Sequence, residues 1–228
     1  MAILYLIYPT YLATYSDIAI LDPDRDIAAP KTLCFGNISH GFETAEGKAW
    51  LVPSLVYVSG KHNFLFGEQA RSPDQLHNQS KRLFQEFKRD IVASFRSPAR
   101  EIDGNHYDAE EIAEIFLTEL WQCLVLQGIQ PTQLIFTVPV GAFEGYLHWF
   151  RNFAERLKFT NFQIIDESTA AALGYAITRP NALVLVIDFG GGTLDLSLVR
   201  TAPIAENVQV FKAEAIAKPD AYIRRDRY

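Results

Sequence analysis

Residues 183–200 read LVLVIDFGGGTLDLSLVR and are the most informative stretch of the chain. The stretch opens with an apolar run, Leu183 to Ile187, that is typical of a buried strand, and a second apolar run follows Thr193. The glycines between the two runs are Gly190, Gly191 and Gly192. This pattern predicts a strand, a tight glycine turn and a second strand.

The chemistry of this turn suits a phosphate group. Without side chains, the backbone N–H groups of the turn can approach a ligand closely and form a concavity that binds anions. Asp188, at the end of the first strand, can hold a magnesium ion through water, and Thr193 adds a hydroxyl group. An ordinary hairpin with a glycine-rich turn remains the alternative, because glycine is common in hairpins.

Upstream of the hairpin, predicted strands alternate with predicted helices. The strands are 133–138 and 162–166, and the helices are 107–127, 143–158 and 167–176. This order predicts an α/β fold with parallel pairing around the crossovers. We expect the two strands and the hairpin 183–200 to be neighbours in one sheet.

The first hundred residues are less regular. We predict strands at 3–8, 18–21 and 51–58 and a hairpin partner at 61–67. Loops with short extended pieces are predicted over 23–50, and a helix within 80–94. A last strand is predicted within 208–217.

Composition narrows the function classes. Of the 228 residues 49% are hydrophobic and 21% are charged, so a packed core is feasible. The net charge of −6 argues against nucleic-acid binding through bulk electrostatics, and no apolar run reaches membrane-spanning length. The two cysteines, Cys34 and Cys123, fit no metal or redox spacing and suggest buried, reduced thiols in a cytoplasmic protein.

Three motifs together resemble the nucleotide-binding domain of the heat shock protein 70 chaperones. They are IFTVPVGAF (135–143), IIDESTAAALGYA (164–176) and VIDFGGGTLDLSLV (186–199), with weaker similarity at GEQAR (67–71) and FKRDI (87–91). Any one motif alone would be weak evidence, but their order and spacing are specific. The resemblance implies an actin-like ATPase fold, whose ribonuclease-H-like lobes close over ATP and magnesium. Residues 1–218 would form lobe I, a mixed sheet with flanking helices.

The resemblance also implies roles for individual residues. The three glycines and Thr193 would contact the β- and γ-phosphates, and Asp188 would serve the magnesium shell. Glu167 would order the attacking water or the metal's waters, and Lys88 would reach the γ-phosphate. Pro139 would couple the ATP state to substrate binding. The partners implied are nucleotide and, in a full-length relative, co-chaperones and unfolded peptides.

Simpler interpretations of these residues stay open at the level of sequence. Glu167 could be a favourable carboxylate at a helix N-terminus, and Lys88 a solvated lysine on an amphipathic helix. Pro139 could merely end a strand.

The sequence departs from the family pattern at both ends and at two internal positions. The family opens with Asp-Leu/Phe-Gly-Thr, whereas residues 1–30 contain no glycine and Asp17 is their first aspartate. Leu147 replaces a usual arginine, and Ser168 replaces a usual proline. We therefore expect a truncated or naturally divergent chain without lobe II, with weak or absent ATPase activity. Residues 219–228 would form a poorly packed tail.

Two other functions remain compatible with the same superfold. One is a small-molecule kinase, such as a sugar kinase, which shares the phosphate-binding hairpin. The other is a non-catalytic interaction module or an actin-like polymer subunit. The stretch ESTAAALGYA (167–176) favours the chaperone family.

Overall fold

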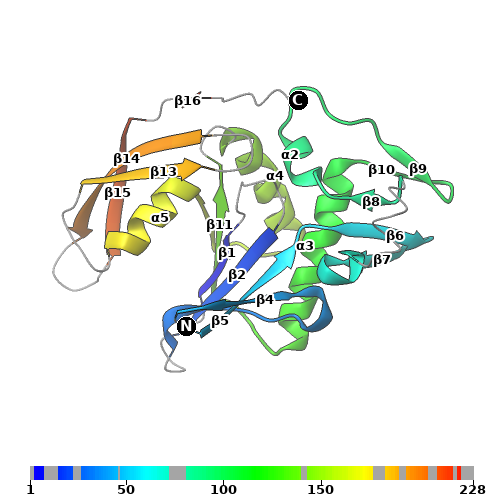
Figure 1. The fold of residues 1–228 in the computed structure, drawn as a ribbon, viewed down its shortest axis with the longest axis horizontal. Coiled ribbons are helices and arrows are strands. Elements are labelled where there is room, and N and C mark those ends of the chain that lie inside the picture. The colour runs from blue at the N-terminus through cyan, green and yellow to red at the C-terminus, as the bar shows by residue number, and fades with distance from the viewer. Residues whose placement is uncertain are drawn as a thin grey trace.

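The computed structural model describes residues 3–7, 15–22, 27–45, 47–71, 81–139, 143–176, 183–189, 194–204, 210–217 and 220–221. Within these ranges the chain is a mixed α/β protein whose two principal sheets lie on either side of a short helix (Figure 1).

The main sheet is mixed, as predicted. Its strands are β1 (Ile3–Ile7), β2 (Tyr15–Asp22), β3 (Ile27–Thr32), β4 (His40–Thr44), β5 (Gly47–Pro53), β11 (Gln133–Val138) and β12 (Phe162–Asp166). They follow the order β12-β11-β1-β2-β5-β4, and β3 pairs with β2. Pairing is parallel from β1 to β11 and from β11 to β12, and antiparallel between β1 and β2. The predicted parallel crossover is therefore present.

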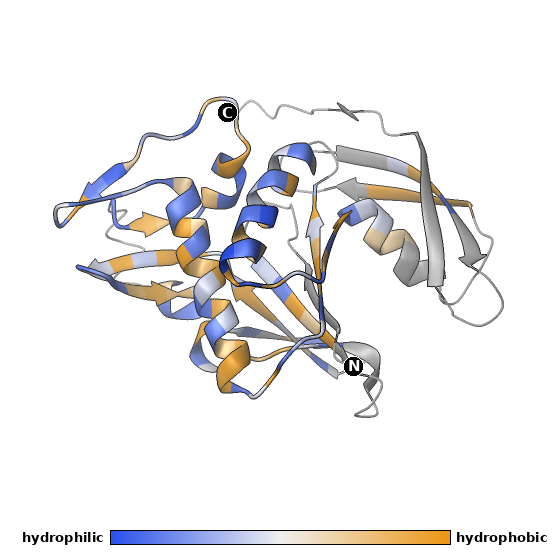
Figure 2. Cartoon of the chain, turned by 180° about the vertical axis from the view of Figure 1, so that it is seen from behind, coloured by the Kyte–Doolittle hydropathy of each residue, from blue (hydrophilic) through white to orange (hydrophobic). Residues whose placement is uncertain are grey.

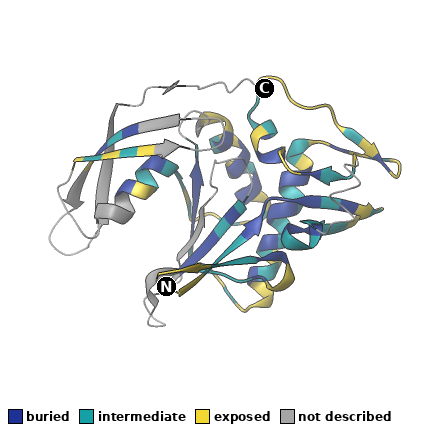
Figure 3. Cartoon of the chain, in the orientation of Figure 1, coloured by how far each residue is buried: buried dark blue, intermediate teal, exposed yellow. Residues whose placement is uncertain are grey.

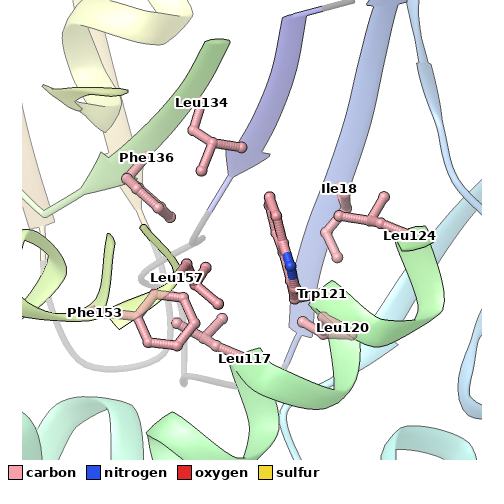
Figure 4. A pocket seen from close by; sticks show the side chains of 9 residues that line it. All are labelled: Ile18, Leu117, Leu120, Trp121, Leu124, Leu134, Phe136, Phe153 and Leu157. Carbon is pink, nitrogen blue, oxygen red and sulfur yellow. The ribbon is translucent and has the colours of Figure 1, made fainter. Parts of the chain in front are cut away.

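Helices α3 (Ala109–Leu126) and α4 (Phe143–Arg156) cover one face of this sheet. Phe136 of β11 stacks on Phe150 of α4 with ring centroids 4.4 Å apart. The apolar side chains labelled in Figure 4 enclose a cavity of about 20 Å³ between the sheet and the two helices. The outer surface of α4 carries hydrophilic residues, which Figure 2 shows from behind. These two helices and the sheet face that they cover hold much of the hydrophobic core.

A local capping motif sets the start of α3. Asp108 is the N-cap, and its carboxylate accepts a hydrogen bond from the N–H of Glu111 at 2.8 Å. The Glu111 carboxylate in turn accepts from the N–H of Asp108 at 3.1 Å. This reciprocal capping box satisfies two helix-end donors and sets the first residue of the helix.

The first half of the chain also forms two smaller sheets. They contain the predicted hairpin partner at 61–67 but change the bounds of the strand predicted before it. One contains β6 (Val56–Gly60), β7 (Asn63–Phe66) and β8 (Leu83–Phe84), and the other is the hairpin of β9 (Arg100–Ile102) and β10 (Asn105–Tyr107). The single strand predicted over 51–58 is wrong, because the chain leaves β5 after Pro53 and enters a different sheet at Val56. The short extended pieces predicted among the loops of 23–50 are present as β3, β4 and the start of β5.

The helix predicted within 80–94 is also much shorter than expected. Only α2 (Phe87–Ile91) is helical, because Leu83 and Phe84 pair with β6 as β8. The Arg100 side chain donates to the carbonyl oxygen of Leu83 at 2.6 Å, which further supports the extended conformation. The periodic apolar positions are buried, but a distant strand overrides the local helical preference.

The hairpin at 183–200 forms, but in a second sheet. This sheet contains β13 (Leu183–Phe189), β14 (Leu194–Ile204), β15 (Val210–Ala217) and β16 (Asp220–Ala221). Asp188 pairs with Asp195 across the antiparallel hairpin. The prediction of one sheet containing β11, β12 and the hairpin is therefore wrong. Helix α5 (Glu167–Ala176) follows β12 directly and contacts strands of both sheets, so it separates them.

Exposure is uneven across the two sheets. Figure 3 shows buried residues in the central strands of the main sheet and exposed ones along β13. Leu183, Leu185 and Ile187 are all more than half exposed. Within the predicted tail, β16 pairs with β14, and the remaining tail residues lie outside the described ranges.

Candidate functional site

Lys88 is the most unusual charged residue of the described structure. It lies on α2, and only 2% of it is exposed to solvent. Its ammonium group donates to the carbonyl oxygen of Tyr15 at 2.9 Å and to the Ser16 hydroxyl at 2.8 Å. Ser16 is itself fully buried, and its hydroxyl lies 3.4 Å from that of Ser54. Lys88 is therefore not a solvated surface lysine; its charge is directed at the first residues of β2.

The charge of Glu167, which is distant in the sequence, acts on this buried lysine. Burial lowers the pKa of Lys88 well below its usual value, and the charge of Glu167 opposes that shift. Glu167 is the first residue of α5, immediately after β12. The fold therefore brings together two of the residues for which the sequence predicted catalytic roles.

The residue before Glu167 fixes the start of α5. Asp166 is buried, and its carboxylate accepts hydrogen bonds from the Thr169 N–H at 2.9 Å and the Thr169 hydroxyl at 2.7 Å. The first bond satisfies one of the free N–H groups of the first helical turn. Asp166 thus holds the helix end from which Glu167 projects.

We expect Asp166→Ala to lower the free energy of unfolding by about 1 kcal/mol, the usual cost of losing a side-chain helix cap. Urea unfolding followed by tryptophan fluorescence measures the change. The control is Thr169→Val, which removes the hydroxyl bond but keeps the capped N–H, and it should cost less. Equal losses in the two variants would contradict the capping role.

Tyr15 is held from a second direction by Arg71. The Arg71 guanidinium donates to the Tyr15 hydroxyl at 2.9 Å and lies 3.5 Å from the carboxylate of Glu68. His40 lies 3.2 Å from the same carboxylate. The first residue of β2 is thus bound through its backbone by Lys88 and through its side chain by Arg71. This anchoring defines the position at which β2 begins.

Tyr146 of α4 completes the surroundings of Lys88. Its side chain is buried, and its hydroxyl donates a hydrogen bond to the backbone carbonyl oxygen of Lys88. Burial raises the pKa of Tyr146, and the charge of Glu167 raises it further. Tyr146 therefore shares the neighbourhood of Lys88 and Glu167.

The remaining predicted site residues come from the hairpin. Asp188 is the last residue but one of β13, and only its backbone is described. The turn itself, with Gly190, Gly191, Gly192 and Thr193, lies outside the described residues. The predicted proximity of Gly191 and Glu167 is therefore untested. Pro139 directly follows β11 and is partly buried.

Sequence analysis did not assign a functional role to three of these neighbours. Tyr15 and Ser16 lie in a stretch without a known phosphate-loop motif, and Tyr146 lies within the predicted helix 143–158. A tyrosine among core positions is a usable signal, because its buried hydroxyl needs a polar partner. No comparable local signal marks Tyr15, which contacts Lys88 through its backbone carbonyl oxygen.

Other site classes receive no support from the described side chains. Among them, no group of three His, Cys, Asp or Glu residues is placed to hold a metal ion. No helix in the described ranges is long and apolar enough to cross a membrane. Cys34 and Cys123 are free thiols, as predicted, although both are partly exposed rather than fully buried.

Comparison with known proteins shows the family of this chain. The family model described as Hsp70 protein matches residues 155–209, which include β12, α5 and the hairpin. The chaperone protein DnaK of Thermosipho melanesiensis is 31% identical over 158 residues. That alignment covers 68% of this chain and 26% of the relative, so the chain spans about a quarter of the chaperone it matches.

These matches agree with the three motifs found in the sequence. The chain belongs to the heat shock protein 70 family. Membership implies the actin-like ATPase fold, and the mixed main sheet with flanking helices is consistent with that fold.

Proposed function

We propose that this chain is a nucleotide-binding part of an Hsp70-like chaperone, which binds ATP with magnesium next to the start of β2. The observation that supports this most strongly is the convergence of Lys88 and Glu167. One is a buried cation bonded to the first residues of β2, and the other is a carboxylate at a helix N-terminus whose charge acts on that cation. Phosphoryl transfer depends on such positioned charges more than on covalent chemistry.

Each predicted residue has a role in this proposal. Lys88 binds the γ-phosphate, and Glu167 orders the attacking water or the waters of the metal. The turn after β13 supplies backbone N–H groups to the β- and γ-phosphates, and Thr193 adds its hydroxyl group. Asp188 binds magnesium through water, which the ion prefers to keep. ATP and magnesium are the cofactors.

Two features lead us to propose weak binding and slow or absent turnover. The Lys88 ammonium already has two short hydrogen bonds within the protein, and both must be exchanged or shared when a phosphate binds. Residues 1–30 also contain no Asp-Leu/Phe-Gly-Thr motif and no glycine, so the first phosphate loop of the family has no sequence counterpart.

The finer architecture is part of the same proposal. Antiparallel β1 and β2 beside parallel β11 and β12 support a ribonuclease-H-like lobe I for the main sheet. Because the hairpin belongs to the second sheet, we place the nucleotide between the two sheets, beside α5. The lobe limits 1–218, the tail 219–228, a cytoplasmic location, and co-chaperones and unfolded peptides as partners stay predictions.

Calorimetric titration with ATP–magnesium tests the proposal. We expect a dissociation constant of about 1 mM or weaker, near −4 kcal/mol, with hydrolysis at the background rate. Gly191→Val should abolish binding by placing a side chain in the phosphate cradle. Gly60→Val is the matched control, because a Cβ at Gly60 meets only Asn63 at 3.9 Å.

The outcomes separate the parts of the proposal. Micromolar binding that is lost in Gly191→Val would contradict the weak site and indicate a working ATPase. Identical binding in the two valine variants would contradict the hairpin as the phosphate cradle. A chain that binds no nucleotide would refute the proposed function.

A further inference from the structure

Helix α2, which carries Lys88, is too short to be stable without contacts from other elements. Helix α2 has only five residues, and its N-cap residue Glu86 makes no side-chain capping bond. Isolated helices of this length are unstable in water, because too few hydrogen bonds offset the cost of forming the first turn. The place of Lys88 is therefore set by whatever packs against α2.

Helix α4 packs against the end of α2 unusually closely. A Cβ atom at Gly145 would lie 2.8 Å from Cγ1 of Val92, the C-cap residue of α2. Real Cβ atoms are essentially never that close to another heavy atom, and valine has a short, stiff side chain. Glycine at position 145 is thus what allows the two helices to meet at this distance.

The next residue of α4 makes a polar contact with the same helix. The Tyr146 hydroxyl donates to the carbonyl oxygen of Lys88. In a longer helix the N–H of Val92 would bond to this oxygen, but here it bonds to the carbonyl of Asp90. Tyr146 therefore supplies a hydrogen bond to a carbonyl oxygen in the last turn of the short helix.

We infer that Gly145 and Tyr146 are positioning residues for the nucleotide site: they fix α2 so that the Lys88 ammonium is directed at the phosphate-binding position. This inference rests on the proposed function. Gly145 sets the distance between the two helices, and the Tyr146 hydroxyl fixes the backbone of Lys88 relative to α4. The influence of Glu167 on both Lys88 and Tyr146 places all three groups in one neighbourhood.

The test removes a single hydroxyl group. Tyr146→Phe keeps the aromatic ring, which stacks on Phe150 with centroids 6.0 Å apart, and removes the hydroxyl that bonds to the Lys88 carbonyl oxygen. Tyr107→Phe is the matched control, because Tyr107 is equally buried but its hydroxyl makes no hydrogen bond within the described residues.

Two measurements are compared between these variants. The first is hydrogen exchange of the amides of residues 87–92, read by mass spectrometry. It should become about tenfold faster in Tyr146→Phe, as expected for one lost hydrogen bond, and should not change in Tyr107→Phe. Gly145→Ala should raise the same exchange, because its Cβ displaces Val92. Unchanged exchange in both α4 variants would overturn the inference.

The second measurement is NMR titration with ATP–magnesium and with ADP–magnesium. Tyr146→Phe should weaken ATP binding about five- to tenfold and leave ADP binding within about twofold, because only ATP has the γ-phosphate that Lys88 contacts. In a Lys88→Met background, Tyr146→Phe should weaken ATP binding no further, because its effect acts through Lys88.

The possible results are distinguishable. Faster exchange with an unchanged ratio of ATP to ADP affinity would show a purely structural hydroxyl and overturn the inference, while the proposed function stands. A wild-type chain that binds neither nucleotide would overturn the proposed function, and the inference with it. Selective loss of ATP affinity together with faster exchange would support both.

Discussion

Gly67→Ala is expected to lower the free energy of unfolding by about 3 kcal/mol or more, because two costs combine at this position. The backbone of Gly67 has a φ of +53°, a left-handed conformation that side chains disfavour. A Cβ would also lie only 2.1 Å from the carbonyl oxygen of Ile38 and 3.0 Å from Val52. The oxygen belongs to a backbone, which cannot rotate away as a flexible side chain could.

The control for this prediction is another glycine with the same backbone conformation. Gly36 has a φ of +62°, and a Cβ there would meet nothing within 4 Å. Gly36→Ala should therefore cost only the conformational strain, about 1 kcal/mol. Urea unfolding midpoints of the two variants separate strain from steric clash, and equal losses would contradict the argument.

The position of Gly67 also matters to the candidate site. Gly67 opens the short 3₁₀ helix η3 (Gly67–Arg71), and its N–H donates to the carbonyl oxygen of Leu55 at 3.0 Å. At the other end of η3, Arg71 binds the Tyr15 hydroxyl. A clash at Gly67 would therefore displace one of the two anchors at the start of β2.

Asp17→Asn is expected to stabilise the protein at neutral pH. Asp17 lies on β2 between Ile7 of β1 and Leu51 of β5, and burial raises its pKa to about 6 from the usual 3.8. One oxygen of its carboxylate is buried without a hydrogen-bond partner among the described residues. The ionised carboxylate is therefore unfavourable in the folded state, and asparagine carries no charge.

The raised pKa of Asp17 determines how the free energy of unfolding changes with pH. Below pH 3.8 the carboxyl group is protonated in both states, so the charge costs nothing. Between pH 3.8 and about 6 the unfolded chain ionises first, and the free energy of unfolding falls as pH rises. Above pH 6 the loss is complete and amounts to at most about 3 kcal/mol, the equivalent of the shift in pKa.

The measurement compares unfolding free energies of wild type and variant from pH 4 to pH 8. The advantage of Asp17→Asn should grow through the window from pH 4 to 6 and then stay constant. Asp103→Asn is the control of opposite sign, because the hydrogen bond from Arg82 lowers the pKa of Asp103. An advantage of Asp17→Asn that does not vary with pH would argue against a buried, ionised Asp17.

Local sequence determined the elements whose stabilising partners are close along the chain. The capping box of Asp108 and Glu111 joins residues three apart, and α5 covers the predicted range 167–176. The antiparallel strands of the hairpin 183–200 are joined by a short turn, so their pairing also follows from local pattern. Two of the three family motifs, 164–176 and 186–199, lie in α5 and the hairpin, so the sequence was sufficient to identify the family.

Tertiary structure alone decided the features that depend on distant partners. Leu83 and Phe84 form a strand because β6 pairs with them, against the helical spacing of their own segment. The hairpin joined a second sheet because α5 packs between the sheets. Lys88 lies on a short helix like many surface lysines. Elements distant in the sequence surround it: β2 with Tyr15 and Ser16, α4 with Tyr146 and α5 with Glu167, while Phe87 beside it packs on Phe116 of α3. Burial and electrostatics are properties of neighbours in space, and periodicity along the chain carries no information about which neighbours these are.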